Sequence, residues 1–335
     1  MNAAVTGGTG FVGQALLRLL VPRAESVRVL VRRQADEARI RALGADPVQG
    51  DITLEGGCDR LVRTGDVVFH CAALVEMNGL WLDYLRTTVQ GTRRLLDAAL
   101  PHKPSRFVYV SSGAVYLRPS VPGAVSAEHT PARPSSYNLY GRAKLEAENL
   151  VRRECERAGC SWTVVRLGFL YGPGNRTLLS HFAPKLRSGL LRIVGRGDNR
   201  IASLDVDDAA GAVLLCGTHP AADRRIYDAA SDEHVTQRQF LDATADVLGL
   251  PRPGRRVPYR LAFAAAALEE CLARLLGRRP RITRAMVALM GADQILDASP
   301  IRSELGWQTY TRFADGMERT RQWYRQQQDV LRNLG

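Results

Sequence analysis

Lysine is almost absent from this chain, although the chain is strongly basic. Among its 46 lysine and arginine residues, the lysines are Lys103, Lys144 and Lys185. Lysine carries a compact ammonium that titrates and can approach a hydroxyl, whereas the guanidinium of arginine is wide, planar and permanently charged. Because a basic position here is nearly always arginine, a lysine inside a motif is a candidate for chemistry. Lys144 ends the stretch PSSYNLYGRAK (134–144) and is such a residue.

Paired cysteines and metal-ligand motifs are also missing. The six cysteines are scattered without a C-x-x-C pair, and His70 beside Cys71 is not complemented by a second such pair. This spacing argues against a disulfide framework and against zinc or any other metal site. The N-terminal MNAAVTGG lacks a basic region followed by an apolar stretch, so we expect neither a secretory signal nor a transit peptide. We therefore expect a cytoplasmic protein with reduced thiols.

The positive charge is spread along the chain and not gathered into blocks. A net charge of +12 could serve nucleic acid, an anionic membrane surface, or an anionic cofactor and substrate. The sequence contains neither a long basic run nor the signature of a common nucleic-acid-binding module. We therefore do not expect nucleic acid as a partner.

Short apolar runs alternate with helical patterns in the first half of the chain. The runs are NAAVT (2–6), VRVLV (27–31), DVVFHCA (66–72), RFVYVSS (106–112) and WTVVRLGF (162–169). This alternation predicts an α/β fold, a Rossmann-type doubly wound parallel sheet with helices on both faces. After YGPGN the pattern changes to loops, the strand-like RIYDAA and several helices. We predict a dinucleotide-binding domain over 1–172, to whose sheet later segments contribute, and a smaller, mostly helical substrate-binding region over 173–335.

A glycine-rich loop follows the first predicted strand and opens the first helix. The stretch TGGTGFVG has glycine in the spacing G-x-x-G-x-x-G. Glycine permits the tight turn, lets a pyrophosphate approach the backbone and packs the helix against the sheet, while the helix N-terminus faces the phosphate charge. This setting predicts a dinucleotide cofactor. The expected contacts in the loop are Gly7, Gly10, Phe11, Val12 and Gly13.

The end of the second predicted strand indicates which dinucleotide is preferred. An acidic residue there would bind the ribose 2′-hydroxyl and favour NAD(H). Instead, Arg32 and Arg33 follow VRVLV, and arginine can bind the additional 2′-phosphate. We predict a preference for NADP(H) over NAD(H), with Asp36 or Glu37 reaching back to the ribose as the alternative.

Two further segments are expected to contact the cofactor. GDI (50–52) follows the probable third strand and would place Asp51 and Ile52 beside the adenine. Ala72 and Ala73 lie at the end of the run 66–72 and complete the predicted set.

A tyrosine and a lysine stand one helical turn apart. On a helix Tyr140 and Lys144 share a face, whereas Gly141 stands four residues after Tyr137. A tyrosine hydroxyl titrates near pH ~10, so it exchanges protons near neutrality only where positive charges, such as an ammonium and an oxidised nicotinamide, stabilise the phenolate. Ser112 ends a predicted strand, where open α/β sheets place ligand-binding groups. We predict Ser112, Tyr140 and Lys144 as the catalytic residues.

Four motifs, TGGTGFVG, VSSGAVY, YGRAK and RLGFLYGPGN, occur in an order and at separations that resemble the extended short-chain dehydrogenase/reductase family. The resemblance implies an NAD(P)-dependent oxidoreductase in which tyrosine is the acid or base, lysine lowers its pKa and holds the nicotinamide ribose, and serine polarises the carbonyl or hydroxyl. By motif these residues are Tyr140, Lys144 and Ser112. The resemblance also implies a homodimer formed through two helices that flank the sheet.

Departures from the nucleotide-sugar enzymes of this family indicate the substrate. Dehydratases carry an Asp-Glu pair directly after the active-site hydroxyl residue, whereas Gly113 and Ala114 follow Ser112, so we expect no carboxylate placed to move an extra proton. Many epimerases have asparagine where RLGFLYGPG has Phe169, and an aromatic residue there favours an apolar substrate over a sugar diphosphate. Thr87 and Thr88 replace an asparagine common in the family.

The C-terminal part resembles the 3β-hydroxysteroid dehydrogenase-like branch, whose members include sterol C4-decarboxylating dehydrogenases and bacterial reductases of long-chain 3-oxo acids. We therefore predict interconversion of a secondary alcohol and a ketone in an apolar substrate, sterol-like or a 3-hydroxy/3-oxo acid. A nucleotide-sugar epimerase is the alternative within enzymes. A cofactor-sensing or RNA-binding protein on the same scaffold is the alternative outside them.

The segment 259–277 is predicted to be an amphipathic helix between arginines. It cannot span a membrane because Glu269 and Glu270 interrupt a short apolar run. A helix of this kind could lie on the inner face of the membrane and admit a lipid substrate. The interpretation that we favour is a helix that packs over the substrate pocket or the domain core. Its apolar face comprises Leu261, Ala265, Leu268, Leu272 and Leu275.

Overall fold

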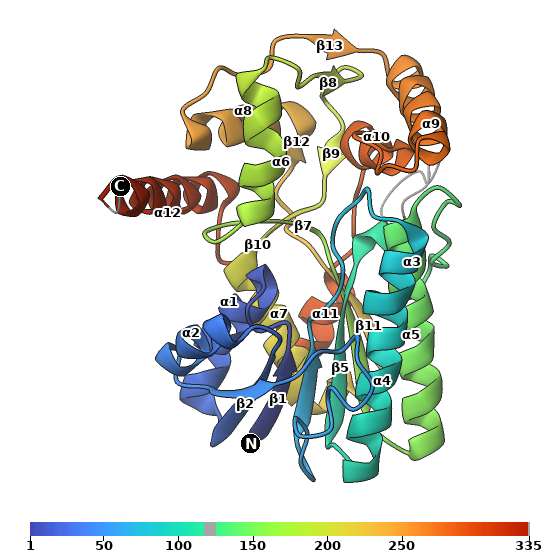
Figure 1. Cartoon of the computed structure of the whole chain (residues 1–335), viewed down its shortest axis with the longest axis vertical. Coiled ribbons are helices and arrows are strands. Elements are labelled where there is room, and N and C mark those ends of the chain that lie inside the picture. Colours follow the sequence, from blue (N-terminus) through green and yellow to red (C-terminus); the bar gives the residue numbers. More distant parts are fainter. Residues whose placement is uncertain (117–124, 334–335) are drawn as a thin grey trace.

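The computed structural model describes residues 1–116 and 125–333. Within this part of the chain, a seven-stranded sheet in the order β11-β6-β5-β4-β1-β2-β3 forms the lower half of the molecule in Figure 1. All neighbouring strands are parallel, as predicted for a Rossmann-type fold. The strands are β1 (Asn2–Thr6), β2 (Ser26–Val31), β3 (Asp46–Gln49), β4 (Val67–His70), β5 (Arg106–Ser112), β6 (Trp162–Leu167) and β11 (Arg225–Ala229).

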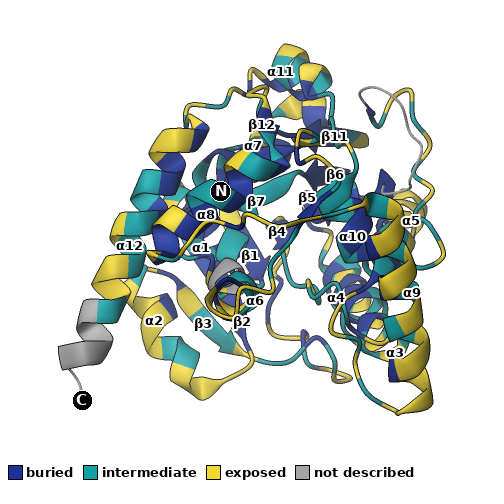
Figure 2. Cartoon of the chain, turned by 90° about the horizontal axis from the view of Figure 1, so that it is seen from above, coloured by how far each residue is buried: buried dark blue, intermediate teal, exposed yellow. Residues whose placement is uncertain are grey.

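Helices cover both faces of the sheet, which explains why its central strands are apolar almost throughout. In β1, Ala3 and Val5 pack into the core on one face, and Ala4 packs into the core on the other. The first face is covered by α1 (Phe11–Leu20), α2 (Glu37–Ala42), α7 (Val206–Thr218) and α11 (Ser299–Leu305), and the second by α4 (Gln90–Ala99) and α5 (Leu139–Ala158). Seen from above, the buried residues fill the centre of the molecule between these layers (Figure 2).

The edge strand β11 comes from the second half of the chain. It corresponds to the strand-like RIYDAA and pairs in parallel with β6, where Tyr227 lies opposite Val165. The helices α7 and α11 also follow residue 172 and pack on the sheet. Later segments therefore contribute to the sheet layer.

The upper half of the molecule in Figure 1 is mostly helical, as predicted for the C-terminal region. It contains α6 (Arg176–Arg187), α8 (Gln237–Leu248), α9 (Tyr259–Leu275) and α10 (Arg284–Gly291), and α12 (Phe313–Asn333) packs against α8. Short strand pairs join these helices: β7 (Phe169–Tyr171) with β10 (Ser203–Asp205), β8 (Ile193–Val194) with β13 (Arg256–Val257), and β9 (Arg200–Ile201) with β12 (Val235–Thr236). Strands of two or three residues are too short to produce a recognisable alternation of apolar residues.

The helix before β5 is interrupted beside the cavity described below. A short helix α3 (Trp81–Tyr84) passes into a π-helical turn, Leu85–Val89, before α4 begins. The turn contains the two threonines noted in the sequence, and Thr88 is fully buried and accepts a hydrogen bond from the backbone nitrogen of Leu74 (3.2 Å). Single π-helical turns inside helices occur frequently at functional sites.

The predicted helix over 259–277 is present as α9 and borders the cavity described below through Ala262, as we favoured, but it packs with a different face. Its leucines are exposed, and the buried positions are Ala262, Ala266 and Ala273. The position of the helix is therefore as favoured, whereas the expectation that its leucine face is the packed one is wrong. No helix in the described ranges has both the length and the apolarity needed to cross a bilayer.

Candidate active site

The loop between β1 and α1 is packed so closely that only glycine fits. Gly7 has a φ of 71°, and a Cβ atom added to it would lie 2.7 Å from the backbone nitrogen of Ala72. A Cβ atom on Gly13 would lie 2.1 Å from the carbonyl oxygen of Gly7. The helix α1 begins after Gly10 without a side-chain cap, so its first N–H groups are available to an anion. The loop thus fits the pyrophosphate of a dinucleotide.

A cavity of about 1540 Å³ extends from this loop past the carboxyl end of β5 into the upper half of the molecule. In open α/β sheets ligands bind at this end of the strands. The structure brings all the predicted site residues to the wall of this one cavity. They are Gly7, Gly10, Phe11, Val12, Gly13, Arg32, Arg33, Asp51, Ile52, Ala72, Ala73, Ser112, Tyr140 and Lys144.

The arginines after β2 differ in their surroundings. Arg33 donates two hydrogen bonds to the carboxylate of Asp36 (2.9 and 3.4 Å), so much of its charge is already balanced. Arg32 forms no ion pair with a carboxylate of the described residues. Two further arginines that the sequence analysis missed, Arg39 and Arg176, line the same cavity. Burial lowers the pKa of Arg39, and the charge of the neighbouring Arg176 lowers it further. The two guanidinium groups therefore lie close enough to repel each other.

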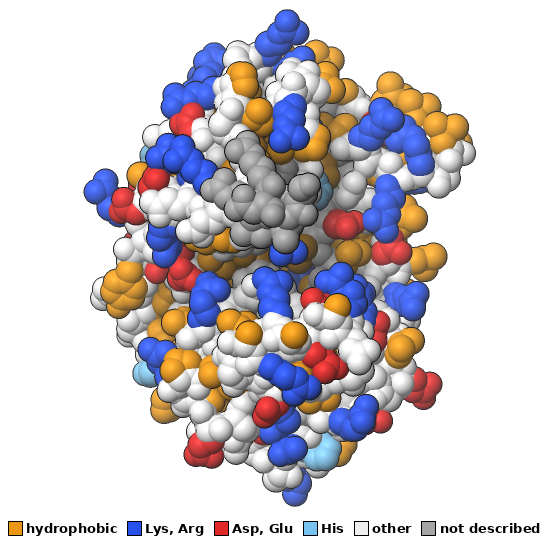
Figure 3. All heavy atoms as spheres, turned by 60° about the vertical axis from the view of Figure 1, so that its left-hand side comes forward, with side chains coloured by type: hydrophobic (Ala, Val, Ile, Leu, Met, Phe, Trp, Pro, Cys, Tyr) orange, Lys and Arg blue, Asp and Glu red, His pale blue; other side chains and the backbone are white. Residues whose placement is uncertain are grey.

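Arginine 39 gave no signal in the sequence because arginine is abundant throughout this chain. Figure 3 shows the same property on one face of the molecule, where Lys and Arg side chains are distributed widely with Asp and Glu between them. The presence of an arginine at a given sequence position therefore gives little evidence for a functional role until the structure shows which groups surround it.

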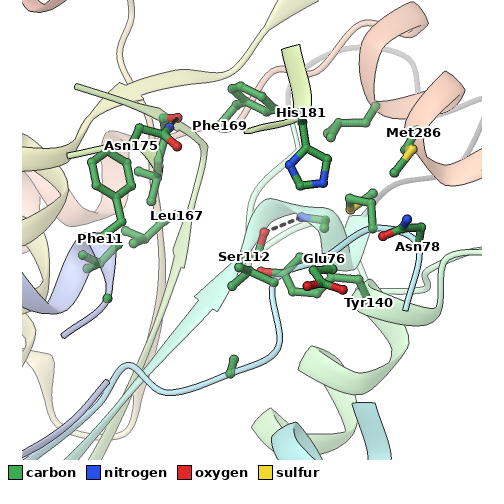
Figure 4. Close-up of a pocket in the computed structure, with 18 of the residues that line it drawn as sticks. Phe11, Glu76, Asn78, Ser112, Tyr140, Leu167, Phe169, Asn175, His181 and Met286 are labelled. Carbon is green, nitrogen blue, oxygen red and sulfur yellow. Dashed lines mark hydrogen bonds between the residues drawn. The ribbon is translucent and has the colours of Figure 1, made fainter. Parts of the chain in front are cut away.

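Ser112 and Tyr140 meet at the cavity wall. Ser112 is the last residue of β5, and Tyr140 lies in the first turn of α5. Burial raises the pKa of Tyr140 above its ordinary value, and a hydrogen bond with the Ser112 side chain opposes this rise. Figure 4 shows both side chains at the cavity, with Glu76 on the lining of the same cavity and His181 pointing toward it from α6. The hydroxyl groups are therefore placed to share one oxygen atom of a ligand.

Asn138, which the sequence analysis did not single out, fixes the relative position of these two residues. It is fully buried and caps α5, because its Oδ1 accepts a hydrogen bond from the backbone nitrogen of Gly141 (2.9 Å). Its Nδ2 donates to the carbonyl oxygen of Ala114 (2.8 Å), two residues after Ser112. A Cβ atom on Gly141 would lie 2.4 Å from this Nδ2 and 2.5 Å from that carbonyl oxygen. Glycine at 141 is thus required by the cap.

Lys144 is buried one turn after Tyr140, and the backbone of β5 binds its ammonium. Its Nζ donates to the carbonyl oxygen of Val110 (2.6 Å) and lies 4.5 Å from the centroid of the Tyr109 ring. Burial lowers the pKa of Lys144 to about 8, against the opposing charges of Glu148 and Cys71. The pKa of Tyr140 responds to burial and to Ser112. The protein alone therefore does not produce the expected lowering of the tyrosine pKa, because burial dominates.

A buried ion pair supports the floor of the site. Arg166 on β6 and Glu148 on α5 are joined by three hydrogen bonds of 2.6 to 3.2 Å, with side chains 5% and 1% exposed. Glu148 also accepts from Ser111, and Arg166 donates to the hydroxyl of Tyr116 (2.5 Å). The network connects two strands to α5: β5 through Ser111, the neighbour of Ser112 in the sequence, and β6 through Arg166. Glu148 stands four residues after Lys144, which is a spacing that could have indicated its place on the same helix face.

The upper part of the cavity is mainly apolar. Phe169 lines it and packs edge-on against Phe240 at a centroid distance of 5.0 Å. Further apolar side chains that line the same cavity are Leu167, Leu191, Ile282, Met286, Leu289 and Leu296. Such a wall binds an apolar ligand, since each buried polar group without a partner would weaken binding.

A carboxylate is nevertheless present in the cavity. Glu76, in the loop after β4, lines the same cavity as Ser112 and Tyr140 (Figure 4). The Glu76 carboxylate accepts a hydrogen bond from Arg279 (2.8 Å), so its charge is partly balanced. That no carboxylate is placed to move an extra proton stays a prediction, because Glu76 comes from a different segment than Ser112 and is paired with Arg279.

Comparisons with known proteins agree with this geometry. The model of the NAD dependent epimerase/dehydratase family matches residues 3–230. The chain is 31% identical over 332 residues to the 4-hydroxy-2-methyl-3-oxo-4-farnesyl-3,4-dihydroquinoline-1-oxide ketoreductase of Stigmatella aurantiaca, with 96% of each chain covered. It is 29% identical to sterol demethylase protein B of Methylococcus capsulatus, with 97% of this chain and 99% of that protein covered.

A solved structure extends the comparison to three dimensions. DesIV, a dTDP-glucose 4,6-dehydratase from Streptomyces venezuelae with NAD bound, matches with a TM-score of 0.78 and 26% identity, and 98% of each chain is covered. The sequence resemblance to the extended short-chain dehydrogenases and reductases is confirmed. The chain belongs to the NAD dependent epimerase/dehydratase family.

Proposed function

We propose that this protein is an NADP(H)-preferring oxidoreductase that interconverts a secondary alcohol and a ketone in an apolar substrate. The observation that carries the proposal is the Ser112–Tyr140 pair on the wall of a cavity that also contains the glycine loop. The relatives named as a ketoreductase and a sterol demethylase protein support an apolar substrate, sterol-like or a 3-oxo acid. The apolar wall around Phe169 supports the same class.

In the proposed mechanism each residue of the set has a separate task. The nicotinamide cofactor, when bound, supplies or accepts the hydride at the carbonyl carbon. The hydroxyl of Ser112 donates a hydrogen bond to the substrate oxygen and polarises it. In reduction the Tyr140 hydroxyl gives its proton to that oxygen, and in oxidation the phenolate accepts the proton. Lys144 binds the nicotinamide ribose. To do so, its Nζ either gives up its hydrogen bond to the carbonyl oxygen of Val110 or keeps that bond and donates a second one to the ribose.

The proposed preference for NADP(H) depends on the cations beside the adenine end of the cavity. The side chain of Arg32 forms no ion pair with a carboxylate among the described residues. Arg39 and Arg176 add further positive charge on the cavity wall. A 2′-phosphate carries the negative charge that such a group of guanidinium ions binds. Asp36 is the opposing feature, but its carboxylate is paired with Arg33.

Calorimetric titration of the purified protein with NADPH, NADH and UDP-glucose in parallel tests the proposal. We expect tight binding of NADPH, weaker binding of NADH, and no binding of UDP-glucose. Turnover would then be followed as NADPH absorbance with a panel of apolar ketones and 3-oxo acids. Clear UDP-glucose binding would overturn the proposal in favour of nucleotide-sugar epimerisation. NADPH binding with no turnover of any ketone would favour a cofactor sensor.

We also propose a homodimer through the outer faces of α4 and α5, the helices that flank one face of the sheet. Light scattering coupled to size exclusion would measure the mass in solution, and a monomer at micromolar concentration would contradict this part of the proposal.

A further inference from the structure

The helix α9 turns its large apolar side chains away from the protein. Leu261, Leu268, Leu272 and Leu275 are 61%, 61%, 43% and 76% exposed. An amphipathic helix of a globular protein normally packs its apolar stripe into the core. Here alanines occupy the buried positions instead, so the leucine stripe has no partner among the described residues.

The stripe is continuous along the whole helix. Glu269 and Glu270 do not interrupt it, because they lie to one side and are engaged by Arg278 (2.7 and 2.9 Å) and Arg284 (2.7 Å). Figure 2 shows exposed residues along the outer side of α9, at the edge of the molecule. The exposed positions at three- and four-residue spacing are Leu261, Ala264, Ala265, Leu268, Cys271, Leu272 and Leu275.

A second exposed apolar segment adjoins α9. Leu80 and Leu82 are 50% and 73% exposed. The chain around them is joined to the end of α9 by ion pairs from Arg279 to Glu76 and Asp83, both 2.8 Å. The apolar surface is therefore wider than one helix, and surfaces of this kind mark interaction sites.

Unpaired arginines flank the stripe at both ends. Arg255, Arg256 and Arg260 lie at its beginning and Arg274 near its end, and all are exposed. None of them forms an ion pair with a carboxylate in the described part of the chain, in contrast to Arg278, Arg279 and Arg284. This arrangement favours a partner whose surface is negatively charged and which has an apolar layer directly beneath that surface.

We propose that α9 docks on an anionic lipid surface, with its leucines between the headgroups and the flanking arginines on the phosphates. A second copy of this chain fits less well. A two-fold interface would bring the same four arginines of each copy toward one another, and like charges at an interface oppose association.

The inner side of the same helix borders the cavity. Ala262 lines the cavity wall, together with Val257, Ile282 and Val287 from neighbouring segments. Ala265 is exposed and also lines the cavity, so the cavity rim reaches the stripe. If the docked face lies in the headgroup layer, an apolar substrate passes from the bilayer into the cavity without crossing water. This last step rests on the proposed function, whereas the docking itself does not.

Co-sedimentation with vesicles tests the docking without any substrate. The full chain is mixed with vesicles of phosphatidylcholine alone or with phosphatidylglycerol added. We expect binding only to the anionic vesicles, and the double substitution L268D/L272D should weaken it by about tenfold or more. The matched control is L54D, at a leucine that is 54% exposed on another surface, and it should bind like the unmodified chain. NADPH titration of each variant checks that it is folded.

Several results would overturn the proposal. One is binding of L268D/L272D that equals that of the control, and another is equal binding to both kinds of vesicle. A third is a lack of vesicle binding together with a dimer that L268D/L272D dissociates, because the stripe would then be the contact between two copies. Reduction of a small water-soluble ketone, measured without vesicles, separates failure of docking from failure of the proposed function.

Discussion

Replacing Asn138 by alanine should destabilise the protein and slow catalysis together. The side chain is fully buried, accepts a hydrogen bond from Gly141 and donates one to the carbonyl oxygen of Ala114. Loss of a helix N-cap costs about 1 kcal/mol, and a buried carbonyl left without its donor costs about 1–3 kcal/mol. The free energy of unfolding should therefore fall by about 2–4 kcal/mol.

The catalytic effect follows from the position of Tyr140 in the first turn of α5. The two hydrogen bonds of Asn138 join this turn to the segment directly after Ser112. A displacement of about 1 Å between reacting groups can slow a reaction by about 100-fold. We expect kcat for ketone reduction to fall by about 10–100-fold, while NADPH affinity should fall much less, because the glycine loop that would bind the pyrophosphate is unchanged and only the contacts from α5 are displaced.

A matched control separates position from stability. Thr236 caps α8 in a capping box with Gln239 and does not line the cavity. Thr236→Ala should also lower the free energy of unfolding by about 1 kcal/mol, but it should leave kcat unchanged. Urea denaturation and steady-state kinetics would be measured on both variants. Full kcat in Asn138→Ala, or an equally slow Thr236→Ala, would refute the reasoning.

Three further predictions concern the same site. Tyr140→Phe should lower turnover by about 100–10,000-fold while calorimetric NADPH binding persists, and an active variant would contradict the role of the tyrosine. Reductase activity should decline as the pH rises through about 8, because burial lowers the pKa of Lys144 to about 8 and its ammonium form predominates only below that value. Lys144→Arg should abolish this decline along with most turnover. The same pH–rate profile in the variant and the unmodified enzyme would show that Lys144 does not cause the decline. Glu148→Gln should lower the free energy of unfolding by about 3–5 kcal/mol, since Arg166 would remain buried without its carboxylate, and urea denaturation with little change would show that the ion pair is dispensable.

Elements whose residues lie next to one another in the sequence could be predicted well. The run RFVYVSS corresponds to β5 residue for residue, and FVGQALLRLL corresponds to α1. Both patterns are local: alternate side chains of a strand face opposite sides of the sheet, and the glycine loop marks where the helix begins. Ser112 and Tyr140 were found because each lies inside a short motif at the end of such an element.

Residues whose role depends on a distant partner could not be predicted. Glu76 and Tyr140 line the same cavity only because the fold brings the loop after β4 and the helix α5 to it. Asn138 was hidden because an asparagine in a loop is common, and only its second bond, to Ala114, shows that it positions the site. For α9 the spacing of the leucines indicated an amphipathic helix, but spacing alone does not determine which side faces the protein. Small alanines allow that helix to lie close to its neighbours, and the leucines are left outside.

The protonation state of Tyr140 determines which step of the proposed reaction needs a further charge beside the phenol. Burial raises the pKa of this tyrosine, with Ser112 opposing the rise, so at neutral pH the phenol carries its proton. A protonated tyrosine can donate to a carbonyl oxygen at once, whereas it must first lose its proton before it can accept one from an alcohol. Lys144 does not help with that loss while its ammonium is bonded to Val110. In the proposed mechanism, therefore, the oxidation step requires a further positive charge beside the phenol, which the nicotinamide ring of an oxidised cofactor would bring, whereas the reduction step can begin from the protonated phenol.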